Sequence, residues 1–107
     1  MPKNERVLAE MLEVIERRKS GDQTISYTAR LYAKGVHKIA QKVGEEAVET
    51  TIAAVAQSNE RLARESADLL YHLLILWSAI GLDMDHVWTE LETRFGAEGI
   101  KEFRKKG

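Results

Sequence analysis

The chain has 107 residues, of which 44% are hydrophobic and 31% are charged, and this length suits one small domain spanning residues 1–107. The net charge of −1 gives no overall field to attract nucleic acid or an acidic membrane surface, so neither is expected as a partner. Without cysteine the chain forms no disulfide, and without a signal peptide or an apolar run of membrane-spanning length we expect a cytoplasmic protein.

The spacing of apolar residues predicts an all-α fold, a small bundle of about five helices without strand-like alternation. The first helix is expected over residues 4–19 and is followed by an exposed loop. Ser26 or Thr28 is expected to cap a short second helix, and Gly35 is expected to separate that helix from the third. The third helix is expected over residues 36–57.

The fourth expected helix, over about residues 60–80, is the most apolar part of the chain. It carries two rows of residues spaced by seven, a pattern typical of packed helical bundles: Leu62, Leu69 and Leu76, and Ser66, Leu73 and Ile80. Its second half, LLYHLLILWSAI, is apolar nearly all round, which predicts burial on several sides. Because a chain this short buries only about 60 to 65% of its unfolded surface, we expect a second copy to complete the bundle as a homodimer or higher homo-oligomer.

A fifth helix is expected at the end of the bundle. Gly81 is a typical residue for the end of the fourth helix, and Asp83 or Asp85 can cap the fifth, which is expected to continue to about Phe95. The remaining tail is short and basic and begins with two glycines, Gly96 and Gly99.

Two groups of acidic residues lie on the third and fourth expected helices: Glu45, Glu46 and Glu49 on the third, and Glu65 and Asp68 on the fourth. Spacings of three and four place Glu46 and Glu49 on one stripe, with Glu45 at its edge, and Glu65 and Asp68 on the matching stripe of the next helix. The short connection near residues 57–60 predicts an antiparallel pair, so these carboxylates are expected to meet. Like charges so close repel one another unless a cation lies between them.

Apolar residues on both sides of the first acidic stripe indicate a groove between packed elements. They are Ile39, Val43, Ala47 and Ala54 on one side and Val48, Ile52 and Val55 on the other. Uncompensated charge is costly in a groove, and carboxylate oxygens are the ligands of hard divalent cations, so Mg²⁺ or Mn²⁺ is expected in preference to zinc. The alternative is a solvated helical hairpin that is held by salt bridges and binds no metal.

Four basic residues repeat every four positions and lead to the acids; this basic row is Arg30, Lys34, Lys38 and Lys42. Like charges at this spacing are mildly destabilising, by roughly 0.2 to 0.5 kcal/mol per pair, which predicts an anionic ligand such as a chain of phosphates. The alternative is an ordinary solvated basic stripe. His72, one turn after Asp68, either hydrogen-bonds that carboxylate or is a buried core histidine.

Several motifs together carry a resemblance to a known family. EAVE at 46–49 and ESAD at 65–68 look like the ExxE and ExxD motifs of the all-α nucleoside triphosphate pyrophosphohydrolases, which include MazG-type enzymes. Three longer segments are more specific: SYTARL at 26–31, KIAQKVGEEAVE at 38–49 and ESADLLYHLLILW at 65–77. They resemble the phosphoribosyl-ATP pyrophosphohydrolase family of histidine biosynthesis.

The resemblance implies hydrolysis of the α–β phosphoanhydride of phosphoribosyl-ATP to phosphoribosyl-AMP and pyrophosphate. It implies Mg²⁺, with Mn²⁺ as the alternative, bound by four acids: Glu46, Glu49, Glu65 and Asp68. It also implies a catalytic role for Glu46 and Glu49, together with Glu45, which would orient the nucleophilic water or complete the metal shell. The residues implied to hold the phosphates are Tyr27, Arg30, Lys34, Lys38 and Lys42.

Three other functions fit parts of this pattern. A housekeeping nucleoside triphosphate pyrophosphohydrolase of the MazG type would share the metal site and differ in substrate. A carboxylate-bridged di-iron bundle requires Glu-x-x-His on two helices, whereas each motif here ends in Glu or Asp. A non-catalytic helical dimerisation module would explain the apolar fourth helix but not the paired acids or the basic row.

Overall fold

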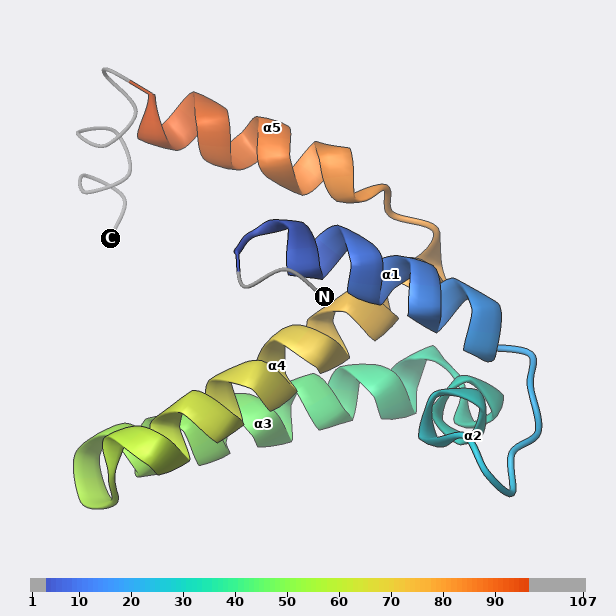
Figure 1. Cartoon of the computed structure of the whole chain (residues 1–107), viewed down its shortest axis with the longest axis horizontal. Coiled ribbons are helices and arrows are strands. Elements are labelled where there is room, and N and C mark those ends of the chain that lie inside the picture. Colours follow the sequence, from blue (N-terminus) through green and yellow to red (C-terminus); the bar gives the residue numbers. More distant parts are fainter. Residues whose placement is uncertain (1–3, 97–107) are drawn as a thin grey trace.

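The computed structural model describes residues 4–96, and in that range it contains five α-helices and no strand (Figure 1). The helices are α1 (Arg6–Arg18), α2 (Tyr27–Lys34), α3 (Val36–Ala56), α4 (Asn59–Ile80) and α5 (Met84–Phe95). The all-α prediction is confirmed, and each helix lies close to the range expected from the sequence. The predicted basic tail, including Gly99, lies outside the described residues.

Local caps and two glycines explain where the helices begin and end. The Ser26 hydroxyl accepts a hydrogen bond of 3.1 Å from the Ala29 backbone N–H, so Ser26 rather than Thr28 caps α2. Gly35 has φ of +92°, which interrupts the helical conformation between α2 and α3. Gly81 has φ of +74° and ends α4. A non-glycine residue rarely adopts such angles. These breaks confirm the predicted division into separate helices.

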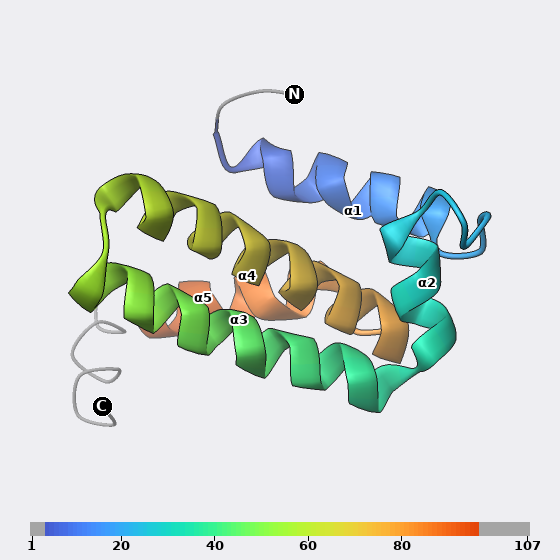
Figure 2. The same ribbon diagram turned by 90° about the horizontal axis from the view of Figure 1, so that it is seen from below.

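Helices α3 and α4 form an antiparallel pair, and they share more contacts than any other two helices among the described residues (Figure 2). Helix α1 packs on α4, and α2 packs mainly on the start of α3. The buried core is made by apolar residues from all five helices: Ile15, Leu31, Ile39, Leu74, Ile75 and Met84. The core therefore lies at the end of the α3–α4 pair where α1 and α2 meet it.

The two rows of seven-residue spacing do not mark the most buried face of α4. The fully buried apolar side chains are Leu74 and Ile75, whereas Leu73 and Leu76 are half-buried and Ile80 is 56% exposed. Five of the six residues in the two rows are half-buried and Ile80 is exposed, so the rows border the buried face of α4, on which α1 and α2 also pack. The predicted burial of this segment on several sides holds only in part.

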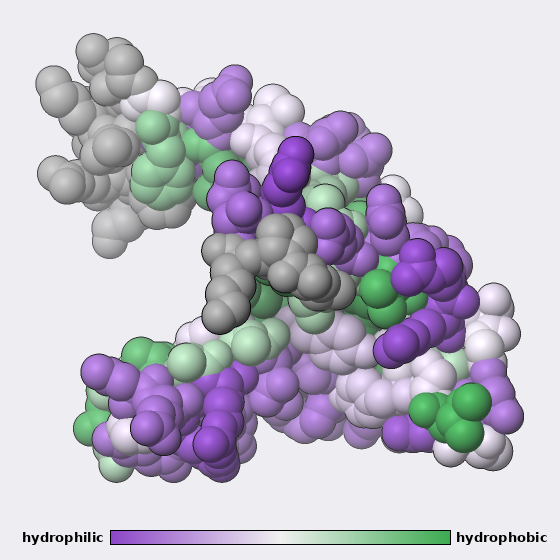
Figure 3. All heavy atoms as spheres, in the orientation of Figure 1, coloured by the Kyte–Doolittle hydropathy of each residue, from purple (hydrophilic) through white to green (hydrophobic). Residues whose placement is uncertain are grey.

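Large apolar side chains remain exposed on α3 and α5. On α3 they are Val48, Ile52 and Val55, and on α5 they are Trp88, Leu91 and Phe95. Helix α5 makes few contacts with the other helices. Figure 3 shows hydrophobic surface on α5 and near the turn between α3 and α4, on either side of an open hollow. On the other flank of the acidic stripe Ile39 is buried and Val43 is half-buried, whereas Ala47 and Ala54 are exposed, so the predicted groove is only partly closed within one chain.

Among residues 4–96, no helix on its own combines the length and the apolar character required to cross a membrane. Helices α4 and α5 meet these two criteria only when they are taken together, and the chain bends by 118° between them.

Candidate active site

Three carboxylates from α3 and α4 face one another across the helix pair. Glu46 on α3 and Glu65 and Asp68 on α4 can each offer an oxygen atom such that all three lie within 4.8 Å of one another. We call these residues the acidic cluster. Glu65 is only 8% exposed, Glu46 is half-buried and Asp68 is exposed, so the cluster opens to solvent on one side. The antiparallel pairing expected from the sequence thus brings three of the five predicted acids together.

The other two predicted acids lie outside the acidic cluster. Glu49 follows Glu46 by one turn of α3, and its side chain is exposed. Glu45 is also exposed, and its carboxylate lies 3.7 Å from Nζ of Lys42 and accepts a hydrogen bond of 3.4 Å from the Gln41 side chain. Glu45 therefore lies at the boundary between the acidic cluster and the basic row.

The electrostatics of the acidic cluster favour a bound cation. Burial raises the pKa of Glu46, and the neighbouring Asp68 and Glu65 carboxylates raise it further against the opposing effects of His72 and Lys42. The existing cations are distant partners, because Lys42 Nζ lies 3.9 Å from Glu46 and Arg61 Nε lies 3.8 Å from Glu65. The negative charge of the three carboxylates is therefore only weakly balanced by these two ion pairs. Carboxylate oxygens are the ligands that hard divalent cations such as Mg²⁺ or Mn²⁺ prefer.

A buried histidine lies behind the acidic cluster. Nδ1 of His72 donates a hydrogen bond of 2.7 Å to the main-chain oxygen of Asp68, and Nε2 accepts one of 2.7 Å from the Tyr27 hydroxyl. The main-chain oxygen of Asp68 can only accept, so Nδ1 of His72 carries the proton of this hydrogen bond. Of the two alternatives from the sequence, the buried histidine is the one observed, and it contacts the backbone of Asp68 instead of its carboxylate.

All five residues predicted to hold phosphates line one pocket of about 220 Å³ beside the acidic cluster. Its walls are Tyr27, Arg30, Lys34, Lys38 and Lys42, together with Leu31, Gln41 and Glu45. Arg30 is held at the rim, because its guanidinium donates to the Gln23 main-chain oxygen at 2.9 Å and lies 5.9 Å from the Tyr27 ring centroid. A pocket with four cations and one carboxylate is suited to a polyanion.

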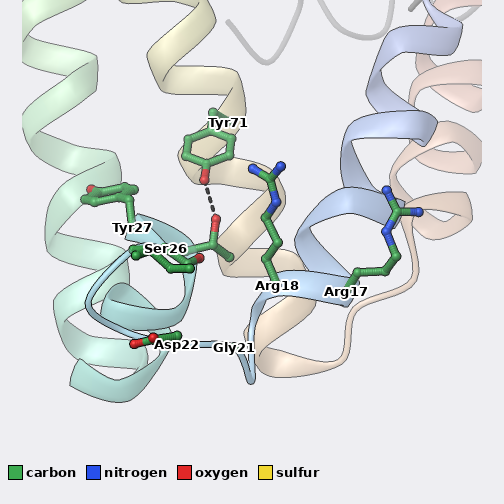
Figure 4. Close-up of a pocket in the computed structure, with 9 residues that line it drawn as sticks. Arg17, Arg18, Gly21, Asp22, Ser26, Tyr27 and Tyr71 are labelled. Carbon is green, nitrogen blue, oxygen red and sulfur yellow. Dashed lines mark hydrogen bonds between the residues drawn. The ribbon is translucent and has the colours of Figure 1, made fainter.

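A larger cavity of about 550 Å³ lies on the other side of Tyr27 (Figure 4). Its walls include Arg17 and Arg18 from the end of α1, and the hydrogen-bonded pair formed by Thr28 and Tyr71. No motif in the sequence pointed to a pocket lined by Arg17, Arg18 and Tyr71. This pocket forms only when α1, α2 and α4 pack together. The sequence of the α1–α2 loop is polar but contains no motif that predicts a pocket.

A small all-α bundle with carboxylates from two antiparallel helices facing one another has the architecture of the all-α nucleoside triphosphate pyrophosphohydrolases. The family model described as "Phosphoribosyl-ATP pyrophosphohydrolase" matches residues 8–95. The chain belongs to this family.

Relatives named phosphoribosyl-ATP pyrophosphatase match the chain along most of its length. The protein from Paramagnetospirillum magneticum is 48% identical over 106 residues, which cover 99% of this chain and 97% of the relative. The protein from Azospirillum brasilense is 51% identical over 96 residues, covering 90% and 86%. The protein from Pyrobaculum arsenaticum is 55% identical over 89 residues, covering 83% and 95%.

Proposed function

We propose that this protein hydrolyses the α–β phosphoanhydride of phosphoribosyl-ATP and releases phosphoribosyl-AMP and pyrophosphate, an early step of histidine biosynthesis. The observation that carries the proposal is the position of Lys42, whose Nζ lies 3.7 Å from Glu45 and 3.9 Å from Glu46. At this point the basic pocket and the acidic cluster adjoin. A triphosphate lying along the basic row therefore has its anhydride beside the carboxylates. Family membership over residues 8–95 supports the same substrate.

The acidic cluster is the proposed site of Mg²⁺, or of Mn²⁺ in its place, with Glu49 as a fourth ligand. When bound, the cation polarises the phosphoryl oxygens and neutralises charge on the departing pyrophosphate. The proposal is supported by Glu46, Glu65 and Asp68, each of which can offer an oxygen atom within 4.8 Å of the other two. Glu49 requires a change of side-chain direction or a bridging water, because its carboxylate lies outside the cluster.

The remaining polar residues bind and orient the reactants. Lys38 and Lys42 lie closest to the acids and are proposed to hold the triphosphate, while Arg30 and Lys34 are proposed to hold the 5′-phosphate of the second ribose. Glu45 accepts a hydrogen bond from Gln41 and has free acceptor capacity, so it can orient the attacking water. The protein forms no covalent intermediate in this proposal, because catalysis of phosphoryl transfer depends mainly on positioning and electrostatic stabilisation.

We also propose that the working form is a homodimer or higher homo-oligomer. The exposed apolar side chains of α3 and α5, which include Ile52, Val55 and Trp88, are more than a small domain leaves uncovered without a partner. A second copy of the same chain would bury them and would give α5 the packing that it lacks within one chain.

The direct test follows the phosphorus-containing products by ³¹P NMR after phosphoribosyl-ATP is mixed with the purified protein and Mg²⁺. We expect equal amounts of pyrophosphate and phosphoribosyl-AMP. Release of inorganic phosphate in place of pyrophosphate would contradict cleavage at the α–β anhydride. Comparable hydrolysis of dATP and dUTP would instead favour a housekeeping pyrophosphohydrolase.

A further inference from the structure

Thr50 contacts the backbone of two acidic-cluster residues that lie on different helices. Its hydroxyl oxygen is 2.7 Å from the main-chain oxygen of Glu46, one turn earlier on α3. The same atom is 3.2 Å from the main-chain oxygen of Glu65 on α4. One half-buried hydroxyl group therefore spans the helix pair at the level of the predicted ligands.

The neighbouring Thr51 shows which of these contacts is unusual. Its hydroxyl donates to the main-chain oxygen of Ala47 at 3.0 Å, the same one-turn contact that Thr50 makes to Glu46. Such contacts are a common property of threonine in helices. Thr51 is exposed and has no recorded bond to α4, so the contact with Glu65 distinguishes Thr50.

The position of this contact gives it a consequence for the acidic cluster. Glu46 lies on α3 and Glu65 on α4, so a small sliding of one helix along the other changes the separation of their carboxylates. Mutual repulsion of these groups tends to widen that separation when no cation is present. The single hydroxyl proton of Thr50 is shared between the main-chain oxygens of Glu46 and Glu65, and the branch to Glu65 opposes the widening.

We propose that Thr50 is a positioning residue that sets the spacing between Glu46 and Glu65 and thereby the affinity of the acidic cluster for a divalent cation. The inference rests on the proposed function only in requiring that the acidic cluster binds a cation. It does not depend on which nucleotide is hydrolysed. Residues that orient metal ligands from outside the coordination shell typically change metal affinity by about 10- to 100-fold when they are replaced.

The test measures Mn²⁺ affinity directly, by electron paramagnetic resonance of free Mn²⁺ during titration of the full-length protein without nucleotide. Thr50→Val keeps the side-chain shape and removes the hydroxyl, and Thr50→Ser keeps the hydroxyl. Thr51→Val is the matched control, because it removes only a one-turn contact. We expect Thr50→Val to bind Mn²⁺ about tenfold more weakly or worse, and the other two variants to bind like the unmodified protein.

Circular dichroism of each metal-free variant shows whether the helices are retained. If Thr50→Val does not fold, Thr50→Ala provides the same test, because alanine lacks the hydroxyl and has the higher helix propensity. Equal Mn²⁺ affinity of the hydroxyl-free variant and the unmodified protein would overturn the inference. So would an equal loss in Thr51→Val, or a failure of Thr50→Ser to preserve the affinity.

The result separates this inference from the proposed function. Failure to hydrolyse phosphoribosyl-ATP would overturn the proposed function. The comparison of Mn²⁺ affinity between the Thr50 and Thr51 variants would remain valid. Absence of Mn²⁺ binding by the unmodified protein would overturn both the positioning role and the metal part of the proposed function.

Discussion

Tyr27 and His72 lie 45 positions apart in the sequence and are joined by a hydrogen bond of 2.7 Å from the tyrosine hydroxyl to Nε2. The opposite nitrogen of the same ring donates to the main-chain oxygen of Asp68. Tyr27 also lines the basic pocket. One buried imidazole thus connects a wall of the basic pocket to the backbone of an acidic-cluster residue.

Replacing Tyr27 by phenylalanine is expected to lower the free energy of unfolding by about 1 to 3 kcal/mol, because the buried Nε2 of His72 loses its partner. Hydrolysis should also slow, because His72 then holds Asp68 less firmly. Urea unfolding and kcat measure the two effects. Tyr71→Phe is the matched control, since it breaks the Thr28–Tyr71 bond between the same two helices without involving an acid. An equal fall in kcat in both variants would contradict the special role of His72.

In the metal-free protein, Glu46 is expected to contribute less stability as pH rises above about 4.5, the ordinary pKa of a glutamate. Burial, with help from Asp68 and Glu65, raises the pKa of Glu46 in the folded state. The folded state therefore binds this proton more tightly than the unfolded state, and the associated stability is present at low pH and disappears as pH rises through the raised pKa. Thermal unfolding in chelator across this range measures the effect.

Glu46→Gln should flatten this part of the pH profile, because it removes the titrating group. Glu49→Gln is the matched control, an exposed acid one turn away on the same helix. An unchanged slope in Glu46→Gln, or the same flattening in both variants, would show that the raised pKa of Glu46 does not govern this part of the pH dependence.

The unmodified protein is expected to be a dimer or larger at micromolar concentration, because a single chain exposes Ile52 and Trp88. Leu73→Asp or Leu76→Asp should cause dissociation coupled to unfolding, since both side chains are half-buried within the chain. Ile52→Asp, at an exposed site, should cause dissociation with less loss of helix, and Thr51→Asp serves as its exposed control. A folded, monodisperse monomer of the unmodified protein in light scattering would refute the expectation.

Phosphoribosyl-ATP is expected to be hydrolysed with a much higher kcat/KM than ATP, because it carries an additional phosphate for the basic row to bind. Each charge-assisted contact supplies about 1.5 to 3 kcal/mol, enough in pairs for roughly a hundredfold preference or more. Arg30→Ala or Lys34→Ala should erode this preference more than it slows hydrolysis of ATP. Lys19→Ala is a suitable control, since Lys19 pairs with Glu16 outside the pocket. A preference unaffected by both substitutions would remove this role from Arg30 and Lys34.

Features that depend on neighbouring residues could be predicted from the sequence. The Ser26 cap and the break at Gly35 are local, and the meeting of Glu46 with Glu65 and Asp68 follows from helical spacing and one short turn. If the two helices are antiparallel, helical spacing places these three acids on facing sides of the pair.

Features that depend on tertiary packing could not be predicted. The partner of His72 comes from a helix that lies 45 positions away, and a threonine within a helix, such as Thr50, carries no sequence signal for a cross-helix bond. The heptad rows failed for Ile80 because the cover provided by α1 and α2 decides which face of α4 is buried. Glu49 lies outside the cluster because a residue can share the acidic stripe and still point to solvent one turn further along.

We propose that the acidic cluster binds a divalent cation that is required for hydrolysis. The most direct measurement is the initial rate of phosphoribosyl-ATP hydrolysis against Mg²⁺ concentration, for the unmodified protein and for Asp68→Asn and Glu49→Gln. We predict no turnover in excess chelator, recovery on addition of Mg²⁺, and almost no activity in either variant, although circular dichroism shows that their helices remain. Full activity in excess chelator, or in both variants, would contradict the claim.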